Sequence, residues 1–65
     1  MVDMDTLTRK ATERGYTLAS LERAANLANG LIKSWEKGSP TLFNLEKVAK
    51  ILNCSIDELV KKEEV

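Results

Sequence analysis

Apolar residues recur along most of the chain at intervals of three or four positions, which is the spacing of one face of an α-helix. The first stripe consists of Met4, Leu7 and Ala11. Asp3 or Asp5 can cap this helix, and Gly15 is a favourable residue for stopping it. The clearest stripe follows Thr41 and consists of Leu42, Leu45, Val48, Ala49 and Leu52. The pattern predicts helices, and no segment shows the strict alternation of a half-buried strand.

Three shorter helices are predicted from the remaining apolar positions. One begins after Thr17 and ends at Asn26, a residue that tolerates the left-handed conformation of a tight turn. Another covers about residues 29–37 and ends at Gly38. The last begins after Ser55, which has capping-box spacing to Glu58. Short turns join all five segments, so we expect an all-α, compact five-helix bundle that forms a single domain over residues 1–65.

Length and cysteine content limit the ways in which such a domain can be stabilised. With 65 residues the chain is near the lower limit at which a hydrophobic core suffices. Its single cysteine, Cys54, has no partner for an intramolecular disulfide, which fits a reducing compartment. No apolar run approaches the roughly 18 residues of a membrane span, and no signal peptide is visible. We therefore expect a soluble, cytoplasmic protein that does not bind membranes.

The net charge of zero hides an uneven distribution. Eight basic and four acidic residues give residues 9–50 a net charge of +4, and each flanking segment carries −2. A phosphate backbone responds to the charge within a Debye length of about 8–10 Å, so the neutral total does not exclude nucleic acid. An ordinary mixed surface is the alternative interpretation of the same distribution.

Residues typical of catalysis are scarce in this sequence. Histidine, the commonest general base and metal ligand, is absent. Cys54 lies at an apolar turn beside Ile56, which favours a buried structural thiol over a nucleophile. The carboxylate pairs Asp57–Glu58 and Glu63–Glu64 are adjacent in sequence and point in different directions on a helix. We therefore predict no enzyme, no catalytic residues, no metal or other cofactor and no small-molecule substrate.

The segment from Thr17 to Gly38 is the strongest candidate for a binding site. A helix, a tight turn and a second short helix form the geometry that places the second helix in a DNA major groove. The inner face of the pair is predicted to hold Leu21, Ala25, Leu27, Ile32 and Trp35. Asn29, Gly30, Lys33 and Ser34 then fall on the outer face. Packed helix pairs without any DNA role are also common, and periodicity does not separate the two cases.

Longer motifs resemble one particular family. The run from Ile32 to Gly38, Ile-Lys-Ser-Trp-Glu-Lys-Gly, is similar to the end of the recognition helix in the Cro/repressor (XRE-type) helix-turn-helix family. Residues 40–42, 45–52 and 55–59 resemble the fourth and fifth helices of that family, and the resemblance covers about residues 4–60. It implies a lambda-repressor-like fold in which the second and third helices form the helix-turn-helix. Within the family, the chain looks most like repressor domains of phages and mobile elements of Gram-positive bacteria.

The resemblance also implies roles for individual residues on double-stranded DNA. Asn29, Gly30, Lys33 and Ser34 match base-reading positions, where Asn can pair with adenine and Lys can donate to guanine. Thr17, Lys37 and the amides at Thr41 match phosphate-binding positions. Two solvated lysines are the alternative interpretation of Lys33 and Lys37.

Several positions depart from the family pattern. Glu22 stands in place of a small alanine, and Ala28 in place of a capping serine or threonine, at a cost of roughly 1 kcal/mol to the third helix. Gly30 is expected inside that helix, where it costs up to about 1 kcal/mol more than alanine. Ala11 stands where a basic partner of Glu36 is often found, so any such ion pair is expected to involve Lys10 or Arg14.

Two functions remain in competition at this point. The first is a sequence-specific transcriptional regulator, expected to be a repressor that binds as a homodimer through Phe43 with help from Val60 or Val65. Packing of the Phe43 ring against Trp35 within one chain is the alternative interpretation of that residue. The second is a protein-interaction module, such as an adaptor or an antitoxin-like partner, that keeps the fold without binding DNA. Leu31 and Phe43 at outer positions favour the second function, and the polar outer face of residues 29–34 favours the first.

Overall fold

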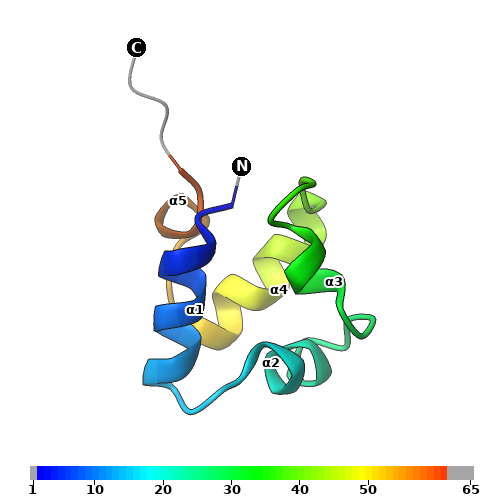
Figure 1. Ribbon diagram of the computed structural model, residues 1–65. Coiled ribbons are helices and arrows are strands. Elements are labelled where there is room, and N and C mark those ends of the chain that lie inside the picture. Colours follow the sequence, from blue (N-terminus) through cyan, green and yellow to red (C-terminus); the bar gives the residue numbers. More distant parts are fainter. Residues whose placement is uncertain (1, 62–65) are drawn as a thin grey trace.

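The chain is described by a computed structural model that covers residues 2–61 (Figure 1). Its elements are α1 (Met4–Glu13), α2 (Leu18–Ala24), α3 (Leu31–Ser34), α4 (Leu42–Leu52) and α5 (Ile56–Leu59). Within residues 2–61 the only β-type pairing is an isolated bridge between Val2 and Val60. The predicted all-α fold with five helices is therefore confirmed. Glu63, Glu64 and Val65, which entered the sequence-based expectations, lie outside the described residues.

Four of the helices begin at polar caps that the sequence indicates. The side chains of Asp3, Thr17, Thr41 and Ser55 each accept the backbone N–H of the residue three positions later. The capping box predicted at Ser55 is present, and the first helix uses Asp3 rather than Asp5. These caps satisfy N–H groups that have no partner inside the helix.

Residues in the left-handed conformation end three of the segments, as the sequence predicts for two of them. Gly15 follows α1 with φ 82°, and Asn26 follows α2 with φ 57°. Asn53 ends α4 with φ 53°. Gly and Asn adopt this conformation with the smallest steric penalty among the amino acids.

The third helix is shorter than predicted. The sequence pattern predicts a helix over about residues 29–37, whereas α3 covers only Leu31–Ser34. Gly30 stands outside the helix with φ 84° and therefore carries no helix-interior penalty, which corrects the expectation stated above. After Ser34 the chain tightens, because the N–H groups of Trp35, Glu36 and Lys37 each bond the carbonyl three residues earlier.

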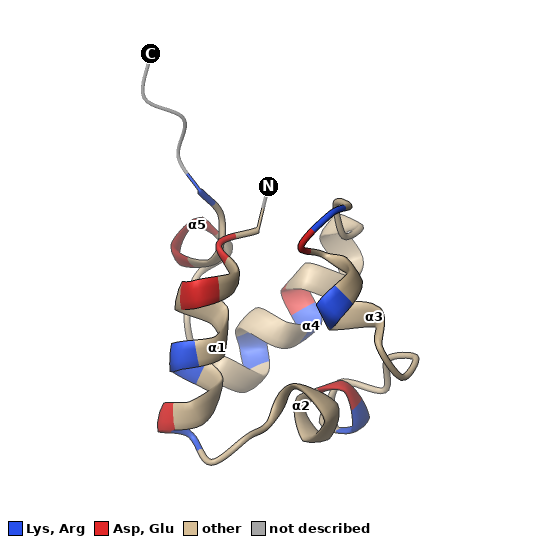
Figure 2. Cartoon of the chain, in the orientation of Figure 1, with Lys and Arg blue, Asp and Glu red and all other residues tan. Residues whose placement is uncertain are grey.

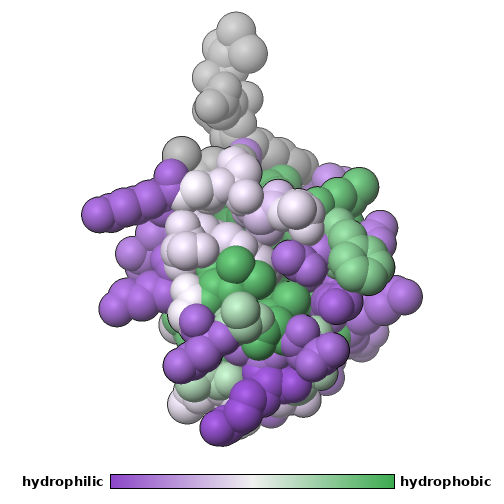
Figure 3. All heavy atoms as spheres, turned by 90° about the vertical axis from the view of Figure 1, so that its right-hand side faces the viewer, coloured by the Kyte–Doolittle hydropathy of each residue, from purple (hydrophilic) through white to green (hydrophobic). Residues whose placement is uncertain are grey.

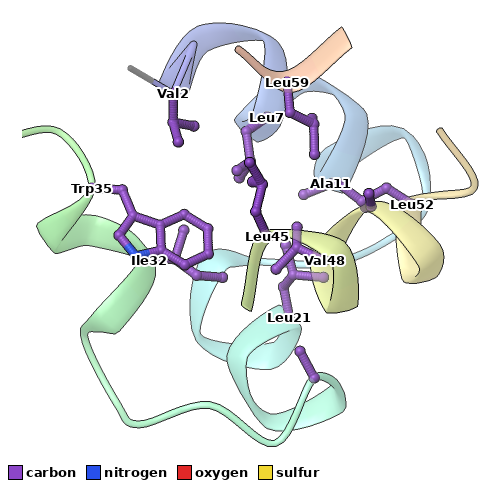
Figure 4. Packing of buried hydrophobic residues seen from close by; sticks show 12 residues of the cluster. Val2, Leu7, Ala11, Leu21, Ile32, Trp35, Leu45, Val48, Leu52 and Leu59 are labelled. Atoms are coloured by element: carbon purple, nitrogen blue, oxygen red, sulfur yellow. The ribbon is translucent and has the colours of Figure 1, made fainter. Parts of the chain in front are cut away.

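All five helices contribute to one hydrophobic core (Figure 4). Its buried members are Val2, Leu7, Ala11, Leu21, Ala25, Ile32, Trp35, Leu45, Val48, Ala49, Leu52 and Leu59. The stripe predicted for the fourth helix lies in this core except for Leu42, whose side chain is 65 % exposed. Leu42 is the first residue of α4 and borders an open apolar groove that also contains Val2, Pro40 and Val60.

The chain start is tied to α5. The N–H of Asp3 donates to the carbonyl of Leu59 at 2.8 Å, and Lys10 forms an ion pair with Glu58 at 3.7 Å. The Ser55 backbone N–H, followed by the Lys10 ammonium, lowers the pKa of the Glu58 carboxyl. Among residues 2–61, Glu36 forms no ion pair with Lys10 or Arg14, so the ion pair that the family pattern suggests for Glu36 is not formed. Lys10 lies close to Glu58 on α5 instead.

Cys54 occupies the turn between α4 and α5. It is half-buried rather than fully buried, and burial raises the pKa of its thiol. A raised pKa leaves little thiolate at neutral pH, which agrees with a structural role in this turn. None of the helices formed by residues 2–61 has both the length and the apolar character needed to cross a membrane.

Candidate nucleic-acid interface

The helices α2 and α3 form a helix-turn-helix in which α3 lies on the side of the molecule away from α1 and α5, while α2 contacts α1 (Figure 1). The turn between them closes through two backbone hydrogen bonds. The N–H of Leu27 donates to the carbonyl of Glu22 at 2.8 Å, and the N–H of Leu31 donates to the carbonyl of Ala28 at 3.1 Å. Asn26 allows this turn through its left-handed conformation.

The inner face of the helix pair agrees with the sequence in four of five positions. Leu21, Ala25, Ile32 and Trp35 are buried, whereas Leu27 is half-buried. Ile32 and Trp35 point from α3 and its end into the same core as Leu21 and Leu45 (Figure 4). The back of α3 is therefore held by apolar packing, and the polar side chains of this segment face away from the core.

The predicted base-reading residues are all exposed, and three of the four line the same depression. Gly30, Lys33, Ser34 and Lys37 line one shallow depression with Glu36, and all of them are exposed. Exposed Asn29 lines a neighbouring hollow with Arg23 and three other residues. Figure 2 shows basic positions on α3 and on the turn that follows it. The structure thus brings Gly30, Lys33 and Ser34 together in one depression, whereas Asn29 lines a separate hollow beside α2.

The hydroxyl of Ser34 already has a partner. It donates to the carbonyl of Leu31 within the same helix. Its remaining capacity is that of an acceptor, which suits the amino group of an adenine or cytosine in the major groove.

The predicted phosphate-binding residues are more widely spread. Thr17 and Thr41 are exposed at the beginnings of α2 and α4, outside the depression that contains Lys37. The backbone N–H of Thr17 donates to the Ser20 hydroxyl at 2.9 Å, and the Thr17 hydroxyl accepts the N–H of Ser20. The amide of Thr17 is engaged in its own capping box, and the Thr17 hydroxyl donates to the Ser20 hydroxyl at 3.2 Å. A phosphate can therefore bind the Thr17 hydroxyl only in place of that contact.

One residue of this site was not recognised from the sequence. Glu22 is 3 % exposed, and its carboxylate accepts the N–H of Gly30 at 3.0 Å and the N–H of Ile32 at 2.8 Å. Sequence comparison with the family pattern showed only a bulky acidic residue in place of alanine. Two features of the sequence together indicate this capping role: a glutamate at an inner helix position, and a following helix whose own cap position holds Ala28.

The α3 side of the molecule has an apolar centre. Figure 3 shows this side with a hydrophobic area in the middle, surrounded by hydrophilic side chains. Exposed Ala28 and half-buried Leu31 belong to the turn and helix on this side. Apolar contacts of this kind can read the methyl group of thymine.

The comparison with known families agrees with this geometry. A family model described as helix-turn-helix matches residues 7–59, which covers most of the chain and all of the surface described above. No curated protein and no solved structure matches the chain. On the strength of the family model and the α2–α3 arrangement, the chain belongs to the Cro/repressor (XRE-type) helix-turn-helix family of DNA-binding transcriptional regulators.

Proposed function

We propose that this protein is a sequence-specific transcriptional repressor that inserts α3 into the major groove of double-stranded DNA. The observation that carries the proposal is the two-sided character of the α3 segment. Ile32 and Trp35 anchor its back in the core, while Asn29, Lys33 and Ser34 are exposed. A short helix held rigidly from behind, with donors and acceptors on its outer side, is what direct readout of base edges requires.

The proposal assigns a role to each exposed polar group. Asn29 pairs with an adenine, Lys33 donates to a guanine, and Ser34 accepts a hydrogen bond from a base amino group. Gly30 has no side chain, so the backbone can approach the DNA closely there. Lys37, the Thr17 hydroxyl and the start of α4 at Thr41 bind phosphates and set the orientation of the domain. A repressor needs nothing further from such a domain, because occupying a promoter is sufficient to block it.

Asn29→Ala and Lys37→Ala are expected to separate base readout from phosphate binding. Asn29→Ala should relax the preference at one or two base pairs, at a cost of roughly 1–3 kcal/mol on the preferred site alone. Lys37→Ala should weaken binding to all sequences by about the same factor. The measurement is fluorescence anisotropy with a duplex enriched from random DNA by the wild-type protein, and with a scrambled duplex. Equal losses on both duplexes for Asn29→Ala would remove the proposed role of Asn29.

We further propose that the repressor binds as a homodimer. Phe43 is 67 % exposed, and the Lys47 ammonium lies over its ring at 4.7 Å from the centroid. Its neighbour Leu42 is 65 % exposed and borders the apolar groove to which Val60 contributes. Adjacent large apolar side chains at the surface are typical of an interaction site. Two domains on a pseudopalindrome also combine their affinities for the two half-sites.

Phe43→Ser is expected to lower self-association and affinity for the enriched duplex together, while the fold of the monomer is unchanged. The side chain is mostly exposed, so its loss costs the monomer core little. Sedimentation velocity with and without the duplex measures both effects, and circular dichroism checks the fold. A wild-type protein that stays monomeric at high concentration and on DNA would rule out the dimer.

A protein-interaction module remains the second candidate function. The exposed pair of Leu42 and Phe43, together with the apolar centre of the α3 side, favours it (Figure 3). The DNA titrations described above separate the candidates, because an adaptor or antitoxin-like module on this fold shows no preference for any duplex.

A further inference from the structure

Glu22 accepts more hydrogen bonds in the α2–α3 turn than a helical residue ordinarily does. Its backbone carbonyl accepts the N–H of Leu27 at 2.8 Å. Its carboxylate oxygens accept the N–H of Gly30 at 3.0 Å and that of Ile32 at 2.8 Å. One residue therefore holds three N–H groups of the segment 27–32, and these three groups lie on both sides of Asn29. The carboxylate is buried, which makes its hydrogen bonds stronger than they are in water.

The α3 helix depends on this contact because it has no local support of its own. It is four residues long, which is far below the length at which a helix is stable by itself. Its N-cap, Gly30, has no side chain to offer and is in the left-handed conformation, and no side-chain cap comes from within the segment. The start of α3 is therefore placed by the single backbone bond from Leu31 to Ala28, by the packing of Ile32 in the core and by the carboxylate of Glu22.

Specific and non-specific DNA binding differ in how much they need such placement. A bidentate contact to a base edge requires a side chain positioned to within about half an ångström. Attraction between lysines and phosphates acts over a Debye length of about 8–10 Å and tolerates much larger displacements. A residue that fixes the backbone around Asn29 and Gly30 thus affects the first kind of binding and hardly affects the second.

We infer that Glu22 is a positioning residue for sequence readout: it holds the base-reading segment in register for the major groove without touching DNA. This inference rests on the proposed function.

The hydrogen bonds of Glu22 also have two consequences for how phosphates meet this surface. The carboxylate occupies the amides of Gly30 and Ile32, so the start of α3 is not available as a phosphate site and the contacts of this helix are left to side chains. The buried negative charge beside this surface also disfavours phosphates that approach it without the correct register.

The test compares Glu22→Ala and Glu22→Gln with the wild type on the enriched and the scrambled duplex. Glu22→Ala removes both acceptors. Glu22→Gln keeps one carbonyl oxygen and turns an NH₂ group toward the other amide, so its effect should be smaller. We expect the ratio of the two dissociation constants to fall by about tenfold or more for Glu22→Ala, the scale of one lost hydrogen bond to a charged group. Affinity for the scrambled duplex should stay the same or rise.

A matched control removes a charge near the same surface without disturbing these hydrogen bonds. Glu36 is exposed and lines the depression with Lys33 and Lys37. Glu36→Gln should strengthen binding to both duplexes by similar factors and leave their ratio unchanged. A change in the ratio for Glu22→Gln but not for Glu36→Gln then reflects position rather than charge.

The backbone amides of Gly30 and Ile32 provide a readout that does not involve DNA. In ¹⁵N–¹H correlation spectra, Glu22→Ala should shift both resonances and speed their hydrogen exchange, while the amides of α1 and α5 remain protected. If the Glu22→Ala variant does not fold, the same measurements are compared between Glu22→Gln and the wild type.

The outcomes separate the inference from the proposed function. A folded Glu22→Ala variant that keeps the full wild-type preference for the enriched duplex overturns the inference and leaves the repressor proposal intact. A wild-type protein without preference for any duplex overturns the proposed function and the role of Glu22 in readout with it. A shift of the two amide resonances in that second case shows that the cap exists but serves the fold alone.

Discussion

Replacing Trp35 by alanine is expected to leave most of the domain unfolded at room temperature. The indole is 2 % exposed and packs beside Ile32 in the core (Figure 4). Removing a buried aromatic side chain costs about 3–5 kcal/mol through lost transfer energy and a residual cavity. A domain of 65 residues without a disulfide has a total stability at or below the lower end of the usual range of about 5–15 kcal/mol. The loss is thus comparable to the whole free energy of unfolding.

Urea titration followed by far-UV circular dichroism measures this effect. Phe43→Ala is the matched control, because it removes the same kind of side chain from a position that is 67 % exposed. At concentrations where the protein is monomeric, its free energy of unfolding should stay within about 0.5 kcal/mol of the wild type. If Trp35→Ala unfolds at nearly the same urea concentration as the wild type, the indole does not support the core as described.

The affinity for DNA is expected to fall steeply as salt rises, with a slope that reports the number of subunits. Each neutralised phosphate contributes about −0.9 to the slope of log K against log salt concentration. In the proposed complex, Lys37 binds a phosphate, and the Lys33 ammonium at its guanine also lies near enough to the DNA backbone to displace a counterion. Counting these two charges, one subunit gives a slope of about −1.8 and a dimer about −3.6. Between about 50 and 200 mM salt, the binding constant then falls about 12-fold for a monomer and about 150-fold for a dimer.

Anisotropy titrations with the enriched duplex at four or five salt concentrations give this slope. Lys10→Gln should leave the slope unchanged, because Lys10 pairs with Glu58 and belongs to α1, which lies on the other side of the molecule from α3 (Figure 2). A variant with both Lys33→Gln and Lys37→Gln should bring the slope close to zero. An affinity that does not vary with salt in the wild type would contradict DNA binding through this surface.

The sequence alone determined the features that depend on neighbours in the chain. Thr17, Thr41 and Ser55 cap helices because each side chain reaches the N–H three residues later, whatever the rest of the fold does. Asn26 stops a helix because of its own backbone preferences. The inner residues Ile32 and Trp35 follow from helical spacing. The same local pattern placed Asn29, Lys33 and Ser34 on the opposite, exposed side.

Features that depend on which distant segments meet were decided only by the tertiary structure. Val2 was not assigned to the core, yet it is 2 % exposed because the chain start lies against the segment after α5. Lys10 pairs with Glu58 rather than Glu36, and Leu42 is exposed because no other part of residues 2–61 covers the groove at the start of α4. Glu22 is the most consequential case. Its hydrogen bonds to Gly30 and Ile32 span eight and ten residues. A buried carboxylate without partners would destabilise the fold, whereas here it caps α3, because the turn brings those two amides to it.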